Sequence, residues 1–507
     1  MRPMLGVGVA VLAMAVGAVP AGASGLNRAD SPVVLKGADV PTLQGTAPGD
    51  VVAFRYDNGW QQTPVQVDQV KMFDITKAYP ATVGTCSDPC YSWTGRTWYE
   101  RVYADPNTLT GAETDEVVNG VTNHANFDAD DEIALMAKDL GGVAPGGTAS
   151  PAGVIGNGVE VKVADPIDSG SAYIYLFERN AGAAQPLDPS AGKSYVTYHW
   201  QVNHVQANHP SDPLATQHYY KNEYRFTGYN GSTSGAGNPE TSFVQTADYR
   251  REMAGRWTDN VMKIFRGAST GANILDRHDE TISFDQSCVR WQGTFDAGEM
   301  AYITSKGGPI RAIRDFLGTN SGPLTERRDV FYESSSDERI DLRVHPVPGP
   351  ETFFAFNPNA IGLRFTEPLG TARIDGVPDA YAGHGAILPN TYTWETVDKD
   401  TQTGLPTDPA PAGALTIVDY FDTNNADPIA HTIWHDGGTG GCNNRPYYGT
   451  SALQAPLVMN TTDVSGSTQS TYLVINRNIH YEAPGTTNGP GRLQQDTTPL
   501  TETATAR

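Results

Sequence analysis

The chain has 507 residues, with 35 basic and 57 acidic side chains and a formal net charge of -22. This charge disfavours nucleic acid and anionic lipid as partners, because both are polyanions. It does not exclude an acidic polymer as a substrate, since a cleft can be basic within an acidic molecule. The length is ample for a large core and for more than one domain.

The first 23 residues resemble a secretory signal peptide. Arg2 carries the one charge, an apolar run extends from Met4 to Val19, and Ala21 and Ala23 have the A-x-A spacing of a signal peptidase site. The apolar run is shorter than the roughly 20 residues of a membrane-spanning helix. We therefore expect a protein that is secreted to the extracellular space and has no membrane span.

Four cysteines fit this oxidising destination. Cys86 and Cys90 enclose Ser-Asp-Pro, so a local disulfide between them is the simplest pairing. Cys288 and Cys442 would then form a long-range disulfide. A zinc site at Cys86 and Cys90 would need two further ligands, and the flanking sequence offers none that is obvious.

The composition predicts an all-β protein. Its 53 glycines and 35 prolines separate short runs rich in Val, Ile, Tyr, Phe and Thr, and long stretches of helical period are nearly absent. Asn58 and Gly59 are a type I′ turn signal between two strands within residues 51–70. In the second strand, valines alternate with Gln66 and Asp68, which predicts that this polar face looks outward.

The predicted architecture is a large antiparallel β-sandwich, similar to a super-sandwich, with a smaller N-terminal β domain. Turn signals occur at irregular spacing, which argues against a propeller or solenoid. A Gly/Ala/Pro-rich stretch places a boundary near residue 160, and the last two dozen residues lack apolar periodicity. The expected parts are a signal peptide at 1–23, an N-terminal β domain at 24–160, a central antiparallel β-sandwich at 161–350, a C-terminal β region completing the sandwich at 351–483, and a disordered tail at 484–507.

Histidines and aromatic residues are concentrated in one stretch of the chain. Four of the 11 histidines lie within twenty residues, at His199, His204, His209 and His218. Histidine titrates nearest neutral pH, and tyrosine offers a second proton donor or a flat surface for a sugar ring. His204 and His209 look like loop residues, and their spacing suits neither one strand face nor one helix face, which disfavours a zinc site.

Two strands within this stretch predict a catalytic surface. Period two places His199 on the polar face of residues 195–202, and a second strand at 218–226 could pair with it. The alternative is that the aromatic residues pack and the histidines lie on solvated faces. The residues of the predicted surface are His199, His218 and Tyr220 for catalysis, with Asn222, Tyr224 and Arg225 for substrate binding.

Such a surface has the groups that β-elimination of a uronic-acid polymer requires. A histidine or tyrosine removes a proton, and a tyrosine returns one to the leaving oxygen. An amide or guanidinium, here Asn222 or Arg225, neutralises the substrate carboxylate.

An acidic loop offers a candidate calcium site. Asp128, Asp130 and Glu132 alternate along it, and carboxylates at alternate positions can converge on a hard cation. The EF-hand template fails, because its sixth position is Ile133 rather than glycine. A solvated turn with strand-capping acids is the alternative, so calcium is a possible cofactor.

A later hairpin leads into a strand that carries two arginines. Lys306, Gly307 and Gly308 predict the turn, and Arg311 and Arg314 follow in an apolar setting. A buried guanidinium needs a partner, so these arginines either line an anion subsite for substrate, with Arg327 as a further candidate, or pair within the chain. The carboxylates near enough in sequence are Asp315, Glu326 and Asp329.

The GGPIRAIRDF segment of this strand resembles the GPxR-type strand of mutarotase-like super-sandwich domains, which occur in some secreted bacterial polysaccharide lyases and related carbohydrate-active proteins. The resemblance implies a large antiparallel sandwich. It also implies a concave sheet that binds a glycan and uses Tyr, His, Asn and Arg for elimination.

The leading hypothesis is a secreted, monomeric enzyme that cleaves an extracellular polysaccharide as a lyase. A non-catalytic glycan-binding or cell-envelope protein is one alternative, and a glycoside hydrolase is another. A hydrolase needs two carboxylates beside the scissile bond, and the sequence offers too many to choose among. The candidates are Glu223, Asp276, Asp279, Glu280, Asp296 and Glu299.

Overall fold

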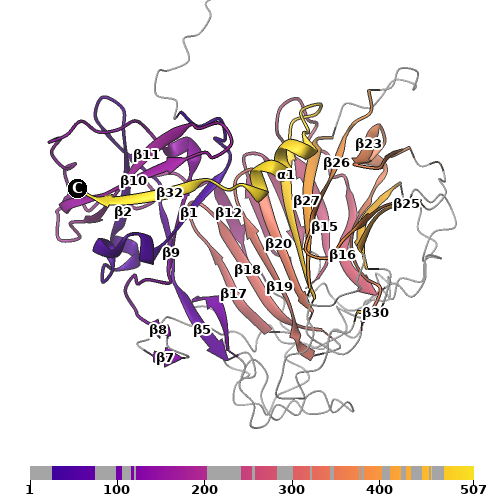
Figure 1. Cartoon of the computed structure of the whole chain (residues 1–507), viewed down its shortest axis with the longest axis horizontal. Coiled ribbons are helices and arrows are strands. Elements are labelled where there is room, and N and C mark those ends of the chain that lie inside the picture. Colours follow the sequence, from indigo (N-terminus) through magenta and orange to yellow (C-terminus); the bar gives the residue numbers. More distant parts are fainter. Residues whose placement is uncertain are drawn as a thin grey trace, which may run out of the picture.

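Antiparallel β-sheets account for nearly all of the regular structure (Figure 1). The computed structural model describes residues 25–74, 99–105, 116–118, 121–201, 241–253, 257–282, 301–319, 322–342, 347–375, 377, 382–401, 412–423, 430–435, 448–455, 458–459 and 473–507. Within this part of the chain the only α-helix is α1 (Gly489–Thr497). The predicted all-β class is confirmed.

The N-terminal unit consists of small antiparallel sheets. A five-stranded sheet with the order β3-β2-β11-β10-β32 and a three-stranded sheet with the order β1-β9-β4 share one apolar core, and β5 pairs with β6 and β7 with β8. The strands are β1 (Pro32–Lys36), β2 (Val51–Tyr56), β3 (Trp60–Thr63), β4 (Gln66–Asp68), β5 (Val70–Asp74), β6 (Tyr99–Tyr103), β7 (Glu116–Val118), β8 (Val121–Asn123), β9 (Glu132–Met136), β10 (Val154–Ala164), β11 (Ser171–Arg179) and β32 (Thr501–Ala506).

Two nine-stranded antiparallel sheets form a sandwich within the described residues. The first sandwich sheet contains, in spatial order, β12 (Val196–His199), β13 (Phe243–Thr246), β14 (Tyr249–Met253), β15 (Asp259–Ile264), β16 (Leu275–Ile282), β22 (Pro350–Phe356), β29 (Thr450–Gln454), β28 (Ala430–His435) and β25 (Ala382–Ile387). The second contains β17 (Ala301–Gly307), β18 (Ala312–Thr319), β19 (Gly322–Phe331), β20 (Ser335–Leu342), β31 (Leu473–Glu482), β27 (Ala414–Thr423), β26 (Tyr392–Lys399), β23 (Leu363–Glu367) and β24 (Gly370–Arg373). A short pair, β21 (Val347–Pro348) and β30 (Val458–Met459), lies outside both sheets.

The interior of the sandwich changes from apolar to ionic along the strands. On the second sandwich sheet Ile417 lies opposite Ile479, and two residues further along β27 Asp419 lies opposite Arg477. All four side chains are buried. Since residues two apart in a strand point to the same face, the inward face carries both apolar and charged residues.

The hairpin predicted from Asn58 and Gly59 is confirmed, with a different loop length. β2 and β3 pair with Tyr56 opposite Trp60, which leaves a loop of three residues rather than two. Asn58 has φ 55°, in the left-handed region that asparagine adopts more readily than most residues. The backbone N–H of Asp57 donates to the carbonyl of Gly59 at 3.0 Å and closes the loop.

The polar face of β4 does not look outward as the alternation predicted. Gln66 and Asp68 are 6% and 0% exposed. Gln66 Oε1 accepts the backbone N–H groups of Ile310 and Arg311 at 3.1 and 3.0 Å, and Asp68 accepts from the Arg311 side chain. The polar face is buried because the loop before β18 supplies partners that the local sequence of β4 does not reveal.

The N-terminal unit extends beyond the predicted boundary at residue 160. That position lies inside β10, which pairs with β11 in the five-stranded sheet. The Gly/Ala/Pro-rich stretch that suggested a boundary therefore precedes two strands of the same unit. Both sandwich sheets combine strands from before and after residue 350.

The predicted disordered tail at 484–507 is wrong. It contains α1 and then β32, which crosses to the N-terminal unit and pairs with β10 (yellow in Figure 1). Leu500 enters the apolar core there, and Arg28 donates to the carbonyl of Thr498 at 2.8 Å. Apolar periodicity is weak in this segment because β32 is an edge strand that is largely exposed.

No helix among the described residues is long and apolar enough to cross a membrane. The predicted signal peptide precedes the described residues, and all four cysteines lie outside them. Secretion and both disulfides therefore stay predictions.

We expect Leu500→Ala to lower the free energy of unfolding by about 2 kcal/mol or more, because it removes a buried leucine side chain from a packed core. Thr505→Ala, at an exposed position of β32, serves as the matched control. Urea unfolding measures both. Equal stability of the two variants would mean that the C-terminal segment is not docked.

Candidate functional site

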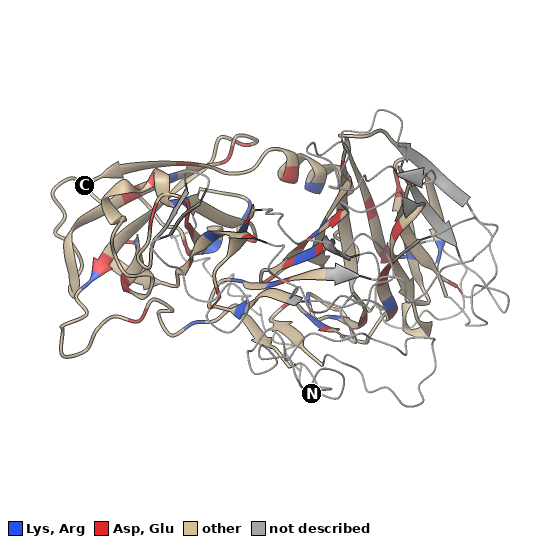
Figure 2. Ribbon diagram, turned by 90° about the horizontal axis from the view of Figure 1, so that it is seen from below, with Lys and Arg blue, Asp and Glu red and all other residues tan. Residues whose placement is uncertain are grey.

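Charged side chains fill the part of the sandwich interior that is not apolar. On the second sandwich sheet Asp419, Arg477, Glu338, Asp329 and Arg314 are successive cross-strand neighbours on five adjacent strands. Figure 2 shows acidic and basic positions mixed along strands of the molecule. We define the buried ionic layer as ten residues, none more than 4% exposed: Arg251, Asp259, His278, Glu280, Arg314, Arg327, Asp329, Glu338, Asp419 and Arg477.

Arg327 connects the two sandwich sheets through this layer. From β19 it donates to Glu280 of the first sheet at 3.0 and 3.2 Å, and to Glu338 of its own sheet at 3.1 Å. Its Nε donates to Asp329 at 2.9 Å and its Nη1 to the carbonyl of Trp257 at 2.8 Å. All three guanidinium nitrogens thus have partners, which offsets much of the cost of burying the charge.

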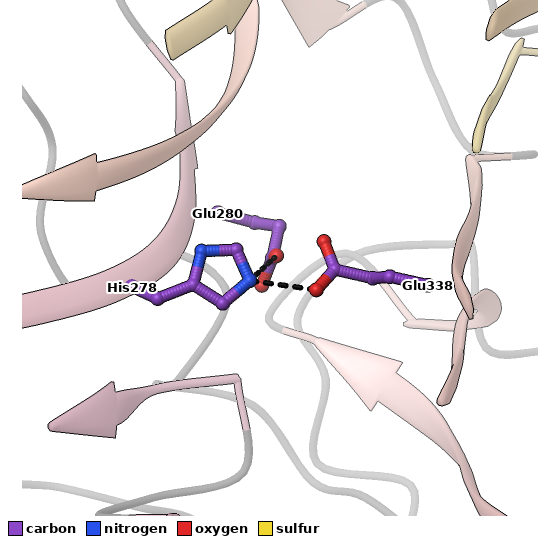
Figure 3. Close-up of side chains that lie close together, drawn as sticks. All are labelled: His278, Glu280 and Glu338. Carbon is purple, nitrogen blue, oxygen red and sulfur yellow. Dashed lines mark hydrogen bonds and ion pairs between the residues drawn. The ribbon is translucent and has the colours of Figure 1, made fainter. Parts of the chain in front are cut away.

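His278 makes the second connection between the sheets (Figure 3). Its ring nitrogen Nδ1 lies 2.8 Å from the carbonyl oxygen of Phe353, and Nε2 lies 2.7 Å from Glu338 Oε2. A carbonyl only accepts, so Nδ1 carries a proton. Two acceptors at 2.7 Å repel each other, so a further proton must lie between Nε2 and Glu338.

Carboxyl groups outnumber guanidinium groups in the layer. Its ten residues include five carboxyl groups and four guanidinium groups, and the buried Glu395, which accepts from Arg477 at 2.6 Å, is a sixth carboxyl group beside it. Burial raises the pKa of Glu280 well above its ordinary value and that of Glu395 to about 7, which favours their neutral forms. Burial lowers the pKa of His278, and Glu338 opposes this effect. Although burial alone would raise the pKa of Glu338, His278 and Arg327 hold it well below its ordinary value.

His278, Glu280 and Glu338 are also the one group of potential metal ligands that the described residues bring together, with ligand atoms within 4.8 Å of one another. The surroundings do not suit a divalent cation. Arg327 already donates to both carboxylates, and Arg251 lies 3.8 Å from Glu338. A metal ion would face these guanidinium groups at close range, whereas a single proton between His278 and Glu338 satisfies the geometry.

Burial assigns the layer a structural role. His278 has 0% of its surface exposed, and a substrate could reach it only if the sheets separated. Two of the carboxylates predicted for a glycoside hydrolase are also buried and ion-paired. Glu280 binds Arg327, and Asp279 binds Arg277. The acid–base groups that the structure arranges most closely therefore hold the sandwich together.

Arg311 joins the N-terminal unit to the sandwich. Its Nε donates to Asp68 of β4 and its Nη2 to Glu132 of β9, both at 2.7 Å, and Nη1 donates to the Tyr332 hydroxyl at 3.2 Å. Lys306 also lies 2.7 Å from Asp68. Arginine and lysine together hold the pKa of Asp68 far below its ordinary value, against the effect of burial.

Neither of the two predicted subsite arginines on this strand faces solvent. Arg311 is 2% and Arg314 0% exposed. Arg314 donates to Asp329 at 3.2 Å, one of the carboxylates predicted as a partner, whereas the partners of Arg311 come from a distant part of the chain. Ion pairing within the chain is the role that the contacts support for both residues.

The acidic loop is organised by hydrogen bonds to its own backbone. Asp131 Oδ2 accepts from the backbone N–H of Asp128 at 3.0 Å, and Asp128 Oδ1 accepts from that of Asp130 at 3.0 Å. Burial raises the pKa of Asp130 to about 7 and that of Asp131 to about 7. Glu132 is bound to Arg311, so the three predicted ligands do not form one cluster, and calcium stays a prediction for Asp128 and Asp130.

His199 lies on the outer face of the first sandwich sheet. β12 pairs with β13 so that His199 stands opposite Phe243, and the two rings stack with centroids 5.1 Å apart. On β14 the Arg250 guanidinium lies 3.9 Å from the Phe243 ring centroid and 2.6 Å from Glu252. His199 Nε2 is 3.1 Å from Gln201 Oε1. We call these five residues the histidine surface.

The strand proposed at 218–226 lies outside the described residues, together with its predicted functional side chains. The pairing with His199 therefore stays a prediction, and the described neighbour of β12 is β13. The residues concerned are His218, Tyr220, Asn222, Tyr224 and Arg225.

The sequence carried a signal for the buried ionic layer that our predictions missed. Runs of consecutive charges occur inside strands, at residues 276–280, 326–329 and 337–339. In a strand with one solvated face, charges should alternate with apolar residues. A run of charges therefore places some of them on the buried face, which is where Glu280, Arg327 and Glu338 lie.

Comparisons with known proteins identify no family for the chain. No family model matches it. No curated protein matches it either. Among solved structures, one described as a "putative mutarotase (YeaD)" from Salmonella typhimurium is 8% identical, with 48% of this chain and 94% of that chain covered and a TM-score of 0.21.

We expect Arg311→Met to destabilise the protein by about 3–5 kcal/mol, because it leaves Asp68 and Glu132 buried without their main partner. Arg55→Ala, which removes a partly exposed ion pair with Asp57, should change stability by less than about 0.5 kcal/mol. Chemical unfolding of both variants tests this. A small effect of Arg311→Met would show that the two units are held together by other contacts.

Asp315 should make stability depend on pH. Burial raises its pKa from 3.8 to about 8, and Glu326 adds to this while Arg328 opposes it. Because the folded state keeps a proton that the unfolded state loses, its contribution is complete below pH about 4 and lost as pH rises through about 8. We expect Asp315→Asn, which mimics the protonated form, to flatten the decline in unfolding free energy across this range. An unchanged slope in urea titrations at several pH values would contradict the assignment.

Proposed function

We propose that the chain is an extracellular carbohydrate-active protein that contacts its glycan at the histidine surface. The supporting observation is the stack of planar groups formed by the exposed His199 and the half-buried Phe243 and Arg250 on three adjacent strands. Aromatic and guanidinium planes beside amide and carboxylate groups can pack against a sugar ring and bind its hydroxyl groups. These strands also lead directly into the histidine-rich segment.

The finer proposal is cleavage of a uronic-acid polymer by β-elimination. A base, His199, takes the proton from the carbon beside the uronate carboxylate. The electron pair of the broken C–H bond forms a double bond to the neighbouring carbon. The bond from that neighbouring carbon to the glycosidic oxygen breaks. The leaving oxygen takes a proton from a second acid, the role predicted for Tyr220.

The contacts of His199 are compatible with the role of base. When Nε2 donates to Gln201 Oε1, Nδ1 keeps a lone pair that can accept a proton. Arg250 supplies a positive charge for the substrate carboxylate, in competition with Glu252. Glycan binding without cleavage is the second candidate, favoured because the closely arranged acid–base pair of His278 and Glu338 is buried away from any substrate.

Incubation with uronate-containing and neutral polysaccharides tests the proposal. Elimination produces unsaturated sugar ends with ultraviolet absorbance, whereas hydrolysis produces reducing ends without it. We expect unsaturated ends from a uronate polymer, and loss of turnover in His199→Ala with unchanged thermal stability, since the side chain is exposed.

Phe243→Ala should weaken binding about tenfold, and Lys162→Ala on the remote β10 strand is the control. Binding without either product would select the non-catalytic candidate. The absence of both binding and products would exclude the histidine surface as the site. Full activity in His199→Ala would also exclude it.

A further inference from the structure

A second row of solvent-facing residues crosses the opposite outer face of the sandwich. Tyr392 on β26 lies opposite Tyr420 on β27, Tyr420 opposite Asn476 on β31, and Asn476 opposite Arg339 on β20. We call these four residues the tyrosine row. Neighbouring strands are about 4.8 Å apart, so the row extends roughly 14 Å across the sheet.

The strand alternation fixes the direction of these side chains. Asp419, Arg477 and Glu338, which flank the row in sequence, point into the buried ionic layer. Tyr420, Asn476 and Arg339, each next to one of these residues in its strand, must therefore face outward. Tyr392 is 45% exposed and the Arg339 side chain 44%, while Tyr420 and Asn476 are half-buried.

The row combines ordered aromatic rings with a side-chain amide. The rings of Tyr392 and Tyr420 stack with centroids 4.3 Å apart and an interplanar angle of 26°, which restricts both. Arg339 is held by two hydrogen bonds to Asp341 at 2.9 and 3.1 Å. No side-chain hydrogen bond joins Asn476 to any other described residue. Groups ordered before binding lose little entropy when a ligand arrives.

Two other parts of the chain border the row on the same face. α1 packs over one end of β31 and β26, where His480 lies 2.9 Å from Asp496 and Gly489 lies against Trp394 (Figure 1). The N-terminal unit covers the outer face of β18 and β19, where Ile313 packs in a cluster with Ala134. The tyrosine row lies on the part of this face that borders both α1 and the N-terminal unit.

We propose that the tyrosine row is a second carbohydrate-binding site, and that its ligand is an uncharged glycan. The tyrosine pair offers ring carbons and hydroxyl groups, and Asn476 offers both a donor and an acceptor, which matches a sugar with C–H and O–H groups. Arg339 already donates two hydrogen bonds to Asp341, which leaves little of its charge for the carboxylate of a uronate polymer. The site lies on the face opposite the histidine surface and does not depend on catalysis there.

The test is retention of the full-length protein on microcrystalline cellulose, insoluble xylan and starch, with soluble polygalacturonate as an acidic competitor. We expect binding to at least one neutral polymer, no competition by polygalacturonate, and about tenfold weaker binding in Tyr392→Ala. Tyr392→Phe keeps the stacked ring and should stay within about twofold. Leu388→Ala removes a nearby side chain that is 60% exposed and should bind like the unchanged protein.

Three results would overturn this proposal. Binding to none of the neutral polymers is the first, and equal binding by Tyr392→Ala and Leu388→Ala is the second. The third is a dimer, detected by sedimentation, that dissociates in Tyr392→Ala, since the row would then contact a second copy of the chain. His199→Ala separates the two proposals, because it should leave binding to neutral polymers unchanged while abolishing turnover of the uronate polymer.

Discussion

The mutual neutralisation of charges between the two sandwich sheets is the constraint on which the rest of the structure depends. A buried ion pair is not by itself a source of stability, because desolvation offsets much of the attraction. A network of buried ion pairs does, however, strongly discriminate between strand registers. A shift of one residue in strand register would turn Arg327, Glu338 and Arg477 to the outer face and leave their partners buried alone. The layer therefore favours one alignment of the sheets over neighbouring ones that an apolar interior would tolerate.

The same principle operates where the N-terminal unit meets the sandwich. Arg311 lies just before β18, and its carboxylate partners belong to β4 and β9 of the N-terminal unit. β32 adds a second connection, since it follows α1 on the sandwich and ends in the N-terminal sheet. Both units are therefore fixed by contacts between residues more than 150 positions apart in sequence.

Local patterns allowed much of the fold to be predicted from sequence, but little of the candidate site. The turn at Asn58 depends on neighbouring residues, so local sequence was sufficient to predict it. The burial of Asp68 could not be predicted, because its partner lies 243 positions away. For the same reason the arginine strand suggested a ligand subsite, although the side chains that neutralise Arg311 belong to the same chain.

These observations shift the search for function to the outer faces of the sandwich. A histidine can act on a substrate only where both can meet, and His278 has its two ring nitrogens committed to Phe353 and Glu338 inside the sandwich. His199 differs in one decisive respect, because it is exposed and bonds to a neutral amide rather than a carboxylate. When Nε2 donates to this neutral amide, Nδ1 keeps a lone pair that can accept a proton from a substrate. Exposure and an available ring nitrogen therefore make His199 better suited to act on a substrate than His278, whose two ring nitrogens are both bonded inside the sandwich.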